Sequence, residues 1–438
     1  MNRIPFLKAI STWQLFQIVR FSSLIATNIF FTKGLLSTAH IGVYESILLI
    51  GSAGSAFWVT GIMQGLLSVF SHQKKSAALF NTFLLMTSVS ILTTGILLLF
   101  TAPITELFRI SNTDLFYKLF PWYVIFLLFN NVSYLNEYFF MITARNKTLL
   151  RYGFLSYGIQ FLLLVLPLLL HYDIVQSIQA LAILGFVKFL FTLYTVRKNA
   201  EWQIDTSFMQ LLLQKSWPLA LAMLVSGYAN YIDGWMIKYF FDEKVFAGFM
   251  YGAREFPISL IMAGALSETL ANTVRKDGLN NTLPVLRTQA RQLSLFLFPI
   301  TYVLIILVPI LFPIIYNKDF AGSALIFNIY LLLLIPRMLF PQSILMGLGK
   351  NRIILLSAIL ELSVNVVASL TLIHLIGWEG AAWGTLIASV IDKLFLWIYA
   401  KKHLSVPLQS VTHIKTWFWG SLFLIFFYML SYYITTLN

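Results

Sequence analysis

Long apolar runs separated by short polar stretches make up almost the whole chain. A helix needs roughly 20 apolar residues to cross a bilayer. Runs of at least about this length are predicted at 12–33, 40–70, 78–102, 116–143, 150–171, 175–197, 212–241, 245–274, 289–315, 321–347, 352–376, 379–400 and 414–435. The stretches between them are too short for a folded soluble domain. The pattern therefore predicts an all-α polytopic membrane protein.

The two ends of this pattern need separate interpretation. The first run follows basic residues, has no small-residue cleavage site at signal-peptide distance and continues past Phe31, so we interpret it as an uncleaved first span. The last run, 414–435, is additional to twelve preceding spans. Its sequence leaves open whether it crosses the membrane or lies along it.

Lysine and arginine are unevenly distributed among the connecting segments. With the N-terminus in the cytoplasm, the outer segments hold only Lys33, Arg109, Lys118, Lys238, Lys244 and Lys318. The inner segments hold Arg3, Lys8, Lys74, Lys75, Arg145, Lys147, Arg151, Arg197, Lys198, Lys215, Arg275, Lys276, Arg287, Arg291, Lys350, Arg352, Lys401, Lys402 and Lys415. This bias is typical of the positive-inside rule and predicts a cytoplasmic N-terminus.

Two sequence landmarks recur at nearly the same distance. Gly42-Val43-Tyr44 opens the second run and Gly248-Phe249-Met250-Tyr251 opens the eighth, with 207 positions between the tyrosines. Ala144-Arg145-Asn146-Lys147 precedes the fifth run and Gly349-Lys350-Asn351-Arg352 precedes the eleventh, with 205 positions between the asparagines. Chance similarity of basic loops is the alternative to an internal duplication.

A duplication of six spans places both halves in the same orientation, because each half has an even number of spans. The halves would then be related by a pseudo-two-fold axis along the membrane normal. We predict two six-helix bundles, 1–200 and 201–403, that enclose a V-shaped central cavity. Residues 404–438 would add one extra C-terminal helix.

Composition and charge narrow the classes of function. Only 11% of the residues are charged, against roughly 25% in soluble proteins, which excludes a soluble protein. The net charge of +13 is explained mostly by the loop bias, so no nucleic-acid partner is expected. The chain has no cysteine for a disulfide or a thiolate site. It also has no P-loop and no metal-binding histidine spacing.

Five basic residues fall inside predicted spans, namely Arg20, Lys188, Arg254, Arg337 and Lys393. A charge inside a span is costly and usually faces a watery cavity or a partner. One hypothesis is a cationic cavity that binds an anionic head group such as a pyrophosphate, for which the arginine fork is well suited. The alternative is neutralisation in ion pairs between helices. Lys393 is nearer the end of its span beside Asp392 and is interpreted as a snorkelling or paired residue.

Four acidic residues, Glu137, Asp233, Glu268 and Glu361, also fall inside predicted spans. They could carry protons or bind a coupling cation, or they could pair with the arginines. Arg254 and Glu268 are 14 residues apart and would share one face of a continuous helix. Prolines lie close to two of the arginines, because Pro257 follows Arg254 by three residues and Pro336 precedes Arg337 directly. Kinks there would favour a cavity at these positions.

The stretch from Leu212 to Arg275 carries a family resemblance. The order Lys-Ser-Trp-Pro-Leu-Ala-Leu, then Tyr-Ile-Asp, then Ala-Gly-Phe-Met-Tyr-Gly-Ala-Arg-Glu resembles the start of the second half of bacterial polysaccharide transporters. These are O-antigen-type flippases, in the superfamily that also holds multidrug and toxin extrusion (MATE) transporters and the lipid II flippase. The single extra C-terminal span departs from the family, whose members more often have twelve or fourteen.

The resemblance implies a MATE-like flippase, not an enzyme, in the bacterial inner membrane. Its substrate would be an undecaprenyl-pyrophosphate-linked oligosaccharide, such as an O-antigen, capsule or exopolysaccharide repeat unit, moved to the outer leaflet by alternating access. The resemblance implies no resident cofactor and leaves a Na⁺ or H⁺ gradient open as the source of coupling. Expected partners are the membrane lipids, and a glycan polymerase and glycosyltransferases are candidates.

Two alternative functions follow from the same sequence. A cation-coupled multidrug exporter of this superfamily commonly has a carboxylate in its first span, where this chain has Arg20 and Asn28. A membrane glycosyltransferase or polymerase needs catalytic residues on sizeable outer loops. The outer segments here are short, except for 103–115 with Glu106 and Asp114.

Overall fold

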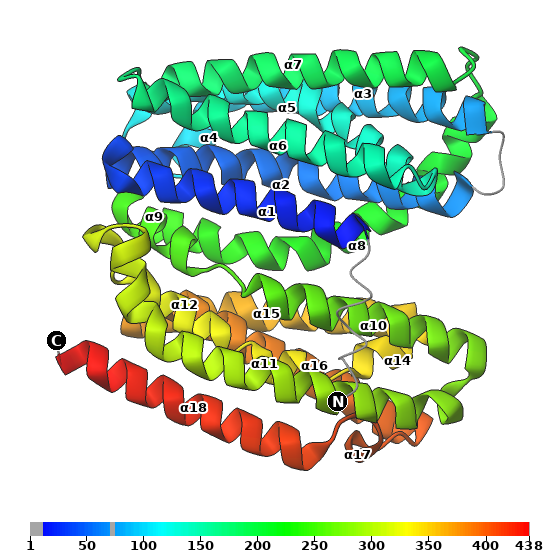
Figure 1. Ribbon diagram of the computed structural model, residues 1–438, viewed down its shortest axis with the longest axis vertical. Coiled ribbons are helices and arrows are strands. Elements are labelled where there is room, and N and C mark those ends of the chain that lie inside the picture. Colours follow the sequence, from blue (N-terminus) through cyan, green and yellow to red (C-terminus); the bar gives the residue numbers. More distant parts are fainter. Residues whose placement is uncertain (1–11, 71–74, 438) are drawn as a thin grey trace. The chain divides into compact units, whose positions relative to one another are not determined.

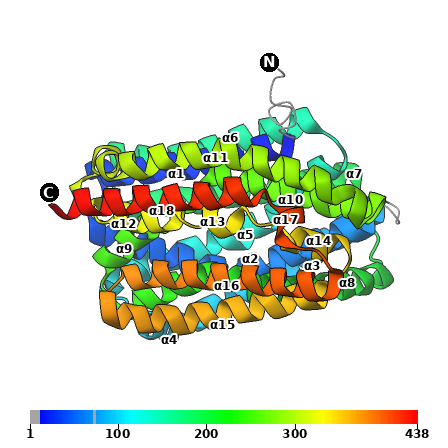
Figure 2. The ribbon, with the colours of Figure 1, turned by 90° about the horizontal axis from the view of Figure 1, so that it is seen from below.

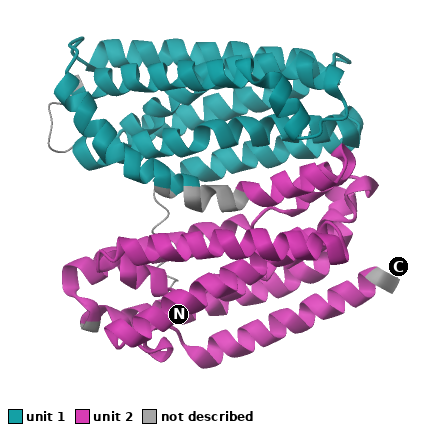
Figure 3. Ribbon diagram, turned by 180° about the vertical axis from the view of Figure 1, so that it is seen from behind, with its two compact units in different colours: residues 1–227 teal, residues 228–438 magenta. Residues whose placement is uncertain are grey.

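The computed structural model describes residues 12–70 and 75–437, and within these ranges every regular element is a helix (Figure 1). The chain divides into two compact units, Met1–Gly227 and Tyr228–Asn438 (Figure 3). The predicted bundle limits at 200 and 403 stay a prediction.

The first unit is built around α5, Thr113–Ile142. This helix packs against four of the other helices of the unit, α2, α3, α6 and α7, while α1 packs against α6. The bounds of the remaining elements are α1 Thr12–Phe30, η2 Phe31–Leu35, α2 Thr38–Val69, α3 Lys75–Leu99, α4 Thr101–Leu107, α6 Asn146–Leu169, α7 Ile174–Asn199 and α8 Thr206–Phe240. The division between the units falls within α8.

The second unit has a broken central segment in the place of α5. The segment consists of α12 Ser323–Leu331, α13 Leu334–Arg337 and α14 Pro341–Gly347. It packs against α9, α10, α11, α15 and α16. The bounds of the other elements are α9 Glu243–Gly252, α10 Pro257–Asp277, α11 Leu279–Ile315, η4 Lys318–Phe320, α15 Asn351–Ile376, α16 Glu379–Leu404, α17 Leu408–Val411 and α18 Ile414–Leu437.

Matching helix caps support the predicted duplication. The Ser37 hydroxyl caps α2 by accepting a hydrogen bond from a backbone N–H, and the Asp242 carboxylate caps α9 in the same way 205 positions later. Asn112, which caps α5, and Asn317, which caps η4, are also 205 positions apart. Side chains of this kind satisfy the free N–H groups of a first turn.

Matching backbone turns give the same result. Ala144 has φ 52° before α6, and Gly349 has φ 69° before α15. His171 has φ 63° after α6, and Gly377 has φ 74° after α15. Positive φ is uncommon outside glycine, so its occurrence in turns 205 and 206 positions apart marks two copies of one backbone plan. The chain therefore contains the predicted internal repeat.

One of the predicted spans is broken in the structure. Among the described residues, ten helices are long and apolar enough to cross a membrane, or eleven if α12 to α14 count as one span bent by 53°. The predicted span 245–274 is wrong as a continuous helix, because α9 ends at Gly252 and α10 begins at Pro257. Proline lacks the N–H that would continue the hydrogen-bond ladder and disfavours helical geometry in the residue before it.

The extra C-terminal helix is present. α18 packs against α11, beside which it lies in Figure 2. Its 24 residues include one of the ten candidate spans, Ile414–Thr435.

Candidate functional site

A cluster of charged and phenolic side chains lies inside the first unit. This first-unit cluster consists of Arg20 on α1, Tyr134 and Glu137 on α5, Tyr157 on α6 and Lys188 on α7. Arg20 Nη2 donates a hydrogen bond of 2.7 Å to the Tyr134 hydroxyl. Its guanidinium lies 5.0 Å from the ring centre of Tyr134 and 5.8 Å from that of Tyr157. Aromatic faces stabilise a cation at such distances.

Glu137 supplies the negative charge of this cluster. It is 4% exposed and accepts a 2.7 Å hydrogen bond from the Tyr157 hydroxyl. Arg20 and Lys188 both attract its charge, yet among the described residues neither forms a direct ion pair with it. Lys188 instead donates to Asn130 Oδ1 at 3.2 Å, and its ammonium lies 5.0 Å from the Tyr157 ring.

The charges of the first-unit cluster do not balance. Arg20 and Lys188 carry two positive charges and Glu137 one negative charge, and Lys188 is only 5% exposed. A buried charge without a counter-charge is unfavourable, so this arrangement favours the binding of an anion. The sequence predicted these three residues as candidates, and the structure brings them together on three helices.

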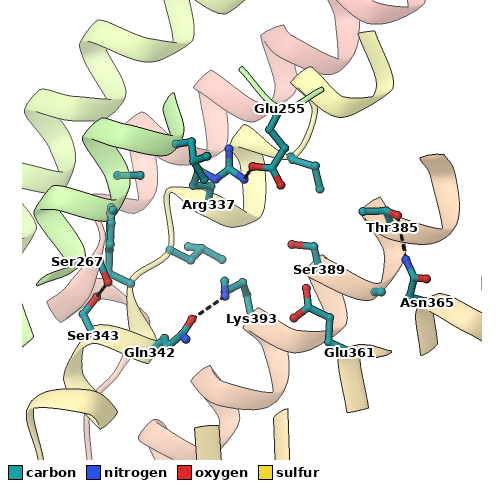
Figure 4. Close-up of a pocket in the computed structure, with 17 residues that line it drawn as sticks. Glu255, Ser267, Arg337, Gln342, Ser343, Glu361, Asn365, Thr385, Ser389 and Lys393 are labelled. Carbon is teal, nitrogen blue, oxygen red and sulfur yellow. Dashed lines mark hydrogen bonds and ion pairs between the residues drawn. The ribbon is translucent and has the colours of Figure 1, made fainter. Parts of the chain in front are cut away.

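A pocket of about 280 Å³ lies inside the second unit. We call it the second-unit pocket. Its walls come from α10, α13, α14, α15 and α16 and from the break before α10 (Figure 4). Its polar lining consists of Glu255, Ser267, Arg337, Gln342, Ser343, Glu361, Asn365, Thr385, Ser389 and Lys393.

Two helix breaks bring Arg337 and Glu255 together at this pocket. Glu255 lies in the break between α9 and α10, and Arg337 lies at the end of the short helix α13. The two side chains form an ion pair and point toward each other in Figure 4. The Arg337 side chain is 18% exposed and the Glu255 side chain is 27% exposed. Arg337 Nη1 also donates to Ser259 Oγ at 3.1 Å. Arg337 therefore lines the pocket with its charge already paired.

Lys393 is the second cation of the pocket. It pairs with Asp392 at 2.6 Å and donates to Gln342 Oε1 at 3.2 Å. Lys188 is found 205 positions earlier on the corresponding helix of the first unit, where it also donates to a side-chain amide on the central helix. Glu361 lines the same pocket without a hydrogen bond or an ion pair among the described residues. The pocket lining therefore holds two carboxylates, Glu255 and Glu361, and two cations, Arg337 and Lys393, and the pairing of Lys393 with Asp392 leaves Glu361 without a cationic partner.

Asp233 occupies a buried site behind the pocket wall. It is 2% exposed, and the Tyr330 hydroxyl donates to Oδ2 at 3.1 Å. The Thr385 hydroxyl also donates to Oδ2, and the Ser369 hydroxyl lies 3.5 Å from Oδ1. Thr385 in turn accepts a 2.9 Å hydrogen bond from Asn365, and both of these residues line the pocket.

No positively charged side chain pairs with Asp233 among the described residues. Hydroxyl groups and the Asn365 amide therefore surround this carboxylate. Of the two interpretations left open by the sequence, proton or cation binding and pairing with an arginine, this geometry favours the first. A carboxylate with several hydroxyl oxygens can accept a proton or ligate a small hard cation.

Two predicted residues lie outside both sites. Arg254 Nε donates to the Met250 carbonyl at 3.2 Å, and its guanidinium lies 5.1 Å from the Tyr251 ring centre. Glu268 is exposed on α10. The prediction that Arg254 and Glu268 share a helical face is wrong, because the break before Pro257 separates Arg254 from α10.

Sequence reasoning missed the hydroxyl groups of both sites. It selected charges inside apolar runs, and neither tyrosine nor threonine is unusual there. The repeat offset would have identified Lys393, since it corresponds to Lys188. No comparable signal marks Tyr330 or Thr385.

The fold matches solved structures of transporters. The lipid II flippase MurJ, in an inward closed conformation, aligns with a TM-score of 0.72 and 16% identity, covering 96% of this chain and 98% of that chain. The chain has the MATE-like fold. An inward-facing multidrug resistance MATE transporter of the MOP superfamily gives a TM-score of 0.65 and 14% identity, covering 89% and 98%. A mutant of the Vibrio cholerae MATE transporter VcmN gives a TM-score of 0.59 and 16% identity, covering 91% and 98%.

These similarities confirm the predicted fold class of the MATE-like chain, a polytopic all-α membrane protein with two related bundles. At 14–16% identity they establish the fold alone. No family model matches the sequence, and no curated protein matches it.

Proposed function

We propose that this MATE-like protein is a flippase for an undecaprenyl-pyrophosphate-linked oligosaccharide in the bacterial inner membrane. The cargo would be an O-antigen, capsule or exopolysaccharide repeat unit, moved outward by alternating access. The observation that carries this proposal is the surplus positive charge of the first-unit cluster. A pyrophosphate would supply the missing negative charge. The overall likeness to the lipid II flippase is consistent with such a cargo.

In this proposal Arg20 and Lys188 bind the pyrophosphate. The guanidinium of Arg20 can contact two phosphate oxygens at once, while the Lys188 ammonium acts as a point charge. The Tyr134 hydroxyl, now bonded to Arg20, orients the guanidinium. Glu137 attracts both cations and holds them near each other when no cargo is bound.

Arg337 would contribute to anion binding at a later stage, whereas a role of Arg254, which lies outside both sites, stays a prediction. Arg337 is paired with Glu255, so the cargo would have to replace that carboxylate. Such an exchange costs little where the pair is partly exposed, because water stabilises the released Glu255.

Asp233 is the proposed site of ion coupling, and both Na⁺ and H⁺ fit its surroundings. A proton would neutralise the carboxylate, and Na⁺ would share its oxygens with those of Thr385 and Tyr330. Either ion removes a buried negative charge, so its arrival and release would change the relative energies of two conformations. Glu361 in the adjoining pocket is a second proton acceptor in this scheme.

A second candidate is a cation-coupled multidrug exporter. Glu361 in the second-unit pocket favours this candidate, because a carboxylate without an ion pair among the described residues would attract a cationic compound. The candidate enzyme functions have less support, since Glu106 and Asp114 line neither this pocket nor the first-unit cluster. A glycan polymerase and glycosyltransferases remain proposed partners of the flippase.

The test is flipping by purified protein in liposomes. A fluorescent undecaprenyl-pyrophosphate oligosaccharide is reconstituted, and a membrane-impermeant quencher measures its transfer between leaflets. Arg20→Gln is expected to slow transfer at least about tenfold, because a charged hydrogen bond to phosphate contributes about 1.5–3 kcal/mol. Arg151→Gln, which removes an exposed arginine from α6, is the matched control.

Normal transfer by Arg20→Gln at normal reconstitution levels would contradict the proposal. Transport of a cationic dye without any transfer of the lipid would instead support the multidrug exporter.

A further inference from the structure

An apolar groove runs between α11 and α18, away from both sites described above. Its volume is about 320 Å³, and its apolar walls include Leu295, Phe298 and Tyr302 from α11 and Trp419 and Phe423 from α18. Lys415 and Thr416 line it near the start of α18. The proposed transport function uses none of these residues.

The two helices contact each other at Gly420, which also lines the groove. A Cβ atom on Gly420 would lie 2.6 Å from the Phe298 ring, so glycine allows close contact here. The Tyr302 hydroxyl donates to the Gly420 carbonyl at 2.9 Å across the same contact. Beside it, Leu295 and Trp419 remain 56% and 55% exposed. The groove therefore opens onto the lipid-facing side of the two helices.

Basic side chains surround the end of the groove nearest the helix starts. Arg287 and Arg291 are exposed on α11 one turn apart, and Lys415 is exposed on α18. Burial lowers the pKa of the His413 imidazole, and the positive charges of these three side chains lower it further. His413 Nδ1 accepts a hydrogen bond of 3.3 Å from the Thr416 backbone N–H, which caps α18. One end of the groove is thus strongly basic.

The dimensions match one leaflet of a membrane. α11 has 37 residues and is about 55 Å long at 1.5 Å per residue, whereas the hydrocarbon core is about 30 Å thick. Part of α11 must therefore lie at head-group level or beyond. From Arg291 to Tyr302 the helix rises by about 16 Å, close to half of the core thickness. A head group at the basic end would place its chain in the apolar groove.

We propose that this groove binds one anionic phospholipid, with its phosphate at Arg287, Arg291 and Lys415 and one acyl chain between α11 and α18. Three cations that form no ion pair within the described part of the chain select an anionic head over a zwitterionic one. The chain fills the space that the aromatic side chains leave open. The bound lipid would then join the extra C-terminal helix to the rest of the second unit.

Native mass spectrometry of the full-length protein in detergent can measure this binding directly. Phosphatidylglycerol is titrated against phosphatidylcholine with the same acyl chains. The triple variant Arg287→Gln, Arg291→Gln and Lys415→Gln is expected to bind phosphatidylglycerol on the order of 100-fold more weakly, about fivefold for each charge. The matched control removes three other exposed cations of the second unit, with Lys350→Gln, Lys401→Gln and Lys402→Gln. Its affinity should change less than about twofold, since these charges lie outside the groove.

A second variant, Leu295→Trp, fills the groove without changing its charge. It should also bind phosphatidylglycerol at least several-fold more weakly, and circular dichroism shows whether the helices are retained. Equal binding of phosphatidylcholine and phosphatidylglycerol by the natural chain would overturn the proposal. Unchanged affinity in the triple variant would do the same. Displacement of phosphatidylglycerol by equimolar undecaprenyl phosphate would assign the groove to the lipid-linked cargo instead.

Discussion

Variants of the ion pair between Arg337 and Glu255 can distinguish a structural role of Arg337 from a role in cargo binding. Replacing Arg337 by alanine removes the positive charge and leaves Glu255 facing the pocket alone. Breaking a fully buried pair costs about 3–5 kcal/mol, whereas an exposed pair contributes about 0.2–1 kcal/mol. With side chains 18% and 27% exposed, this pair lies between these limits, so we expect a loss of about 2 kcal/mol.

The double variant Arg337→Ala, Glu255→Gln removes both charges. It should regain most of the lost stability, because no uncompensated carboxylate remains in the pocket. If Arg337 also binds the pyrophosphate, export should not recover in the same variant. Thermal unfolding in detergent measures the stability of each variant. Export is measured in cells that depend on this protein, from the amount of surface glycan and from the cytoplasmic build-up of the lipid-linked unit.

Arg337→Lys and Glu255→Gln complete the series. Lysine keeps the charge without the fork, so partial export is expected. Membrane levels of every variant are measured alongside, so that loss of protein is not mistaken for loss of transport. Full export by the double variant would refute a role of Arg337 in cargo binding and leave it as a structural partner of Glu255.

Three further predictions concern the buried sites and the packing. Asp233→Asn keeps a hydrogen-bonding oxygen but removes the negative charge, so transport should lose its dependence on a Na⁺ or H⁺ gradient. The dependence is measured in gradient-controlled liposomes, where an unchanged dependence would exclude this coupling site. Lys188→Gln should slow lipid transfer about tenfold or more in the same liposomes, since it removes one of two cations of the first-unit cluster. Gly252→Ala places a Cβ atom 2.4 Å from the Ser323 carbonyl and should destabilise by about 1–3 kcal/mol. Gly264→Ala is the control, because a Cβ atom at this position would have nothing within 4 Å, and the variant should unfold at an almost unchanged temperature.

The sequence predicted the membrane fold and the repeat well because both depend on regular patterns. Apolar run lengths mark spans directly, and the turn before α6 recurs before α15 with the same backbone geometry. A kink beside Pro257 was expected, but the complete break at 253–256 was not, because a proline inside a span can also be accommodated by a bend in a continuous helix. Pro257 was the available signal, and its effect on the preceding residues decides where α9 and α10 separate.

The sites could be predicted only in part. Charges inside apolar runs identified Arg20, Glu137 and Lys188, which the structure brings together. The same reasoning could not tell that Arg337 meets Glu255, because that contact depends on two helix breaks and joins residues 82 positions apart in the chain. The hydroxyl groups around Asp233 were not predictable, since tertiary packing alone decides which hydroxyls reach a carboxylate.

The corresponding lysines 188 and 393 have a consequence for how this molecule arose. An ancestor made of two identical subunits would carry the same balance of charge in both copies, and any mutation would change both together. Once the copies were joined in one gene, each could acquire its own acidic residues around a shared lysine. In this chain the first copy holds more cations than carboxylates around this lysine, while Glu255, Glu361 and Asp392 lie around the corresponding lysine of the second copy. Two copies in one polypeptide can thus differ in the charge of their sites, which a symmetric dimer of identical chains could not do.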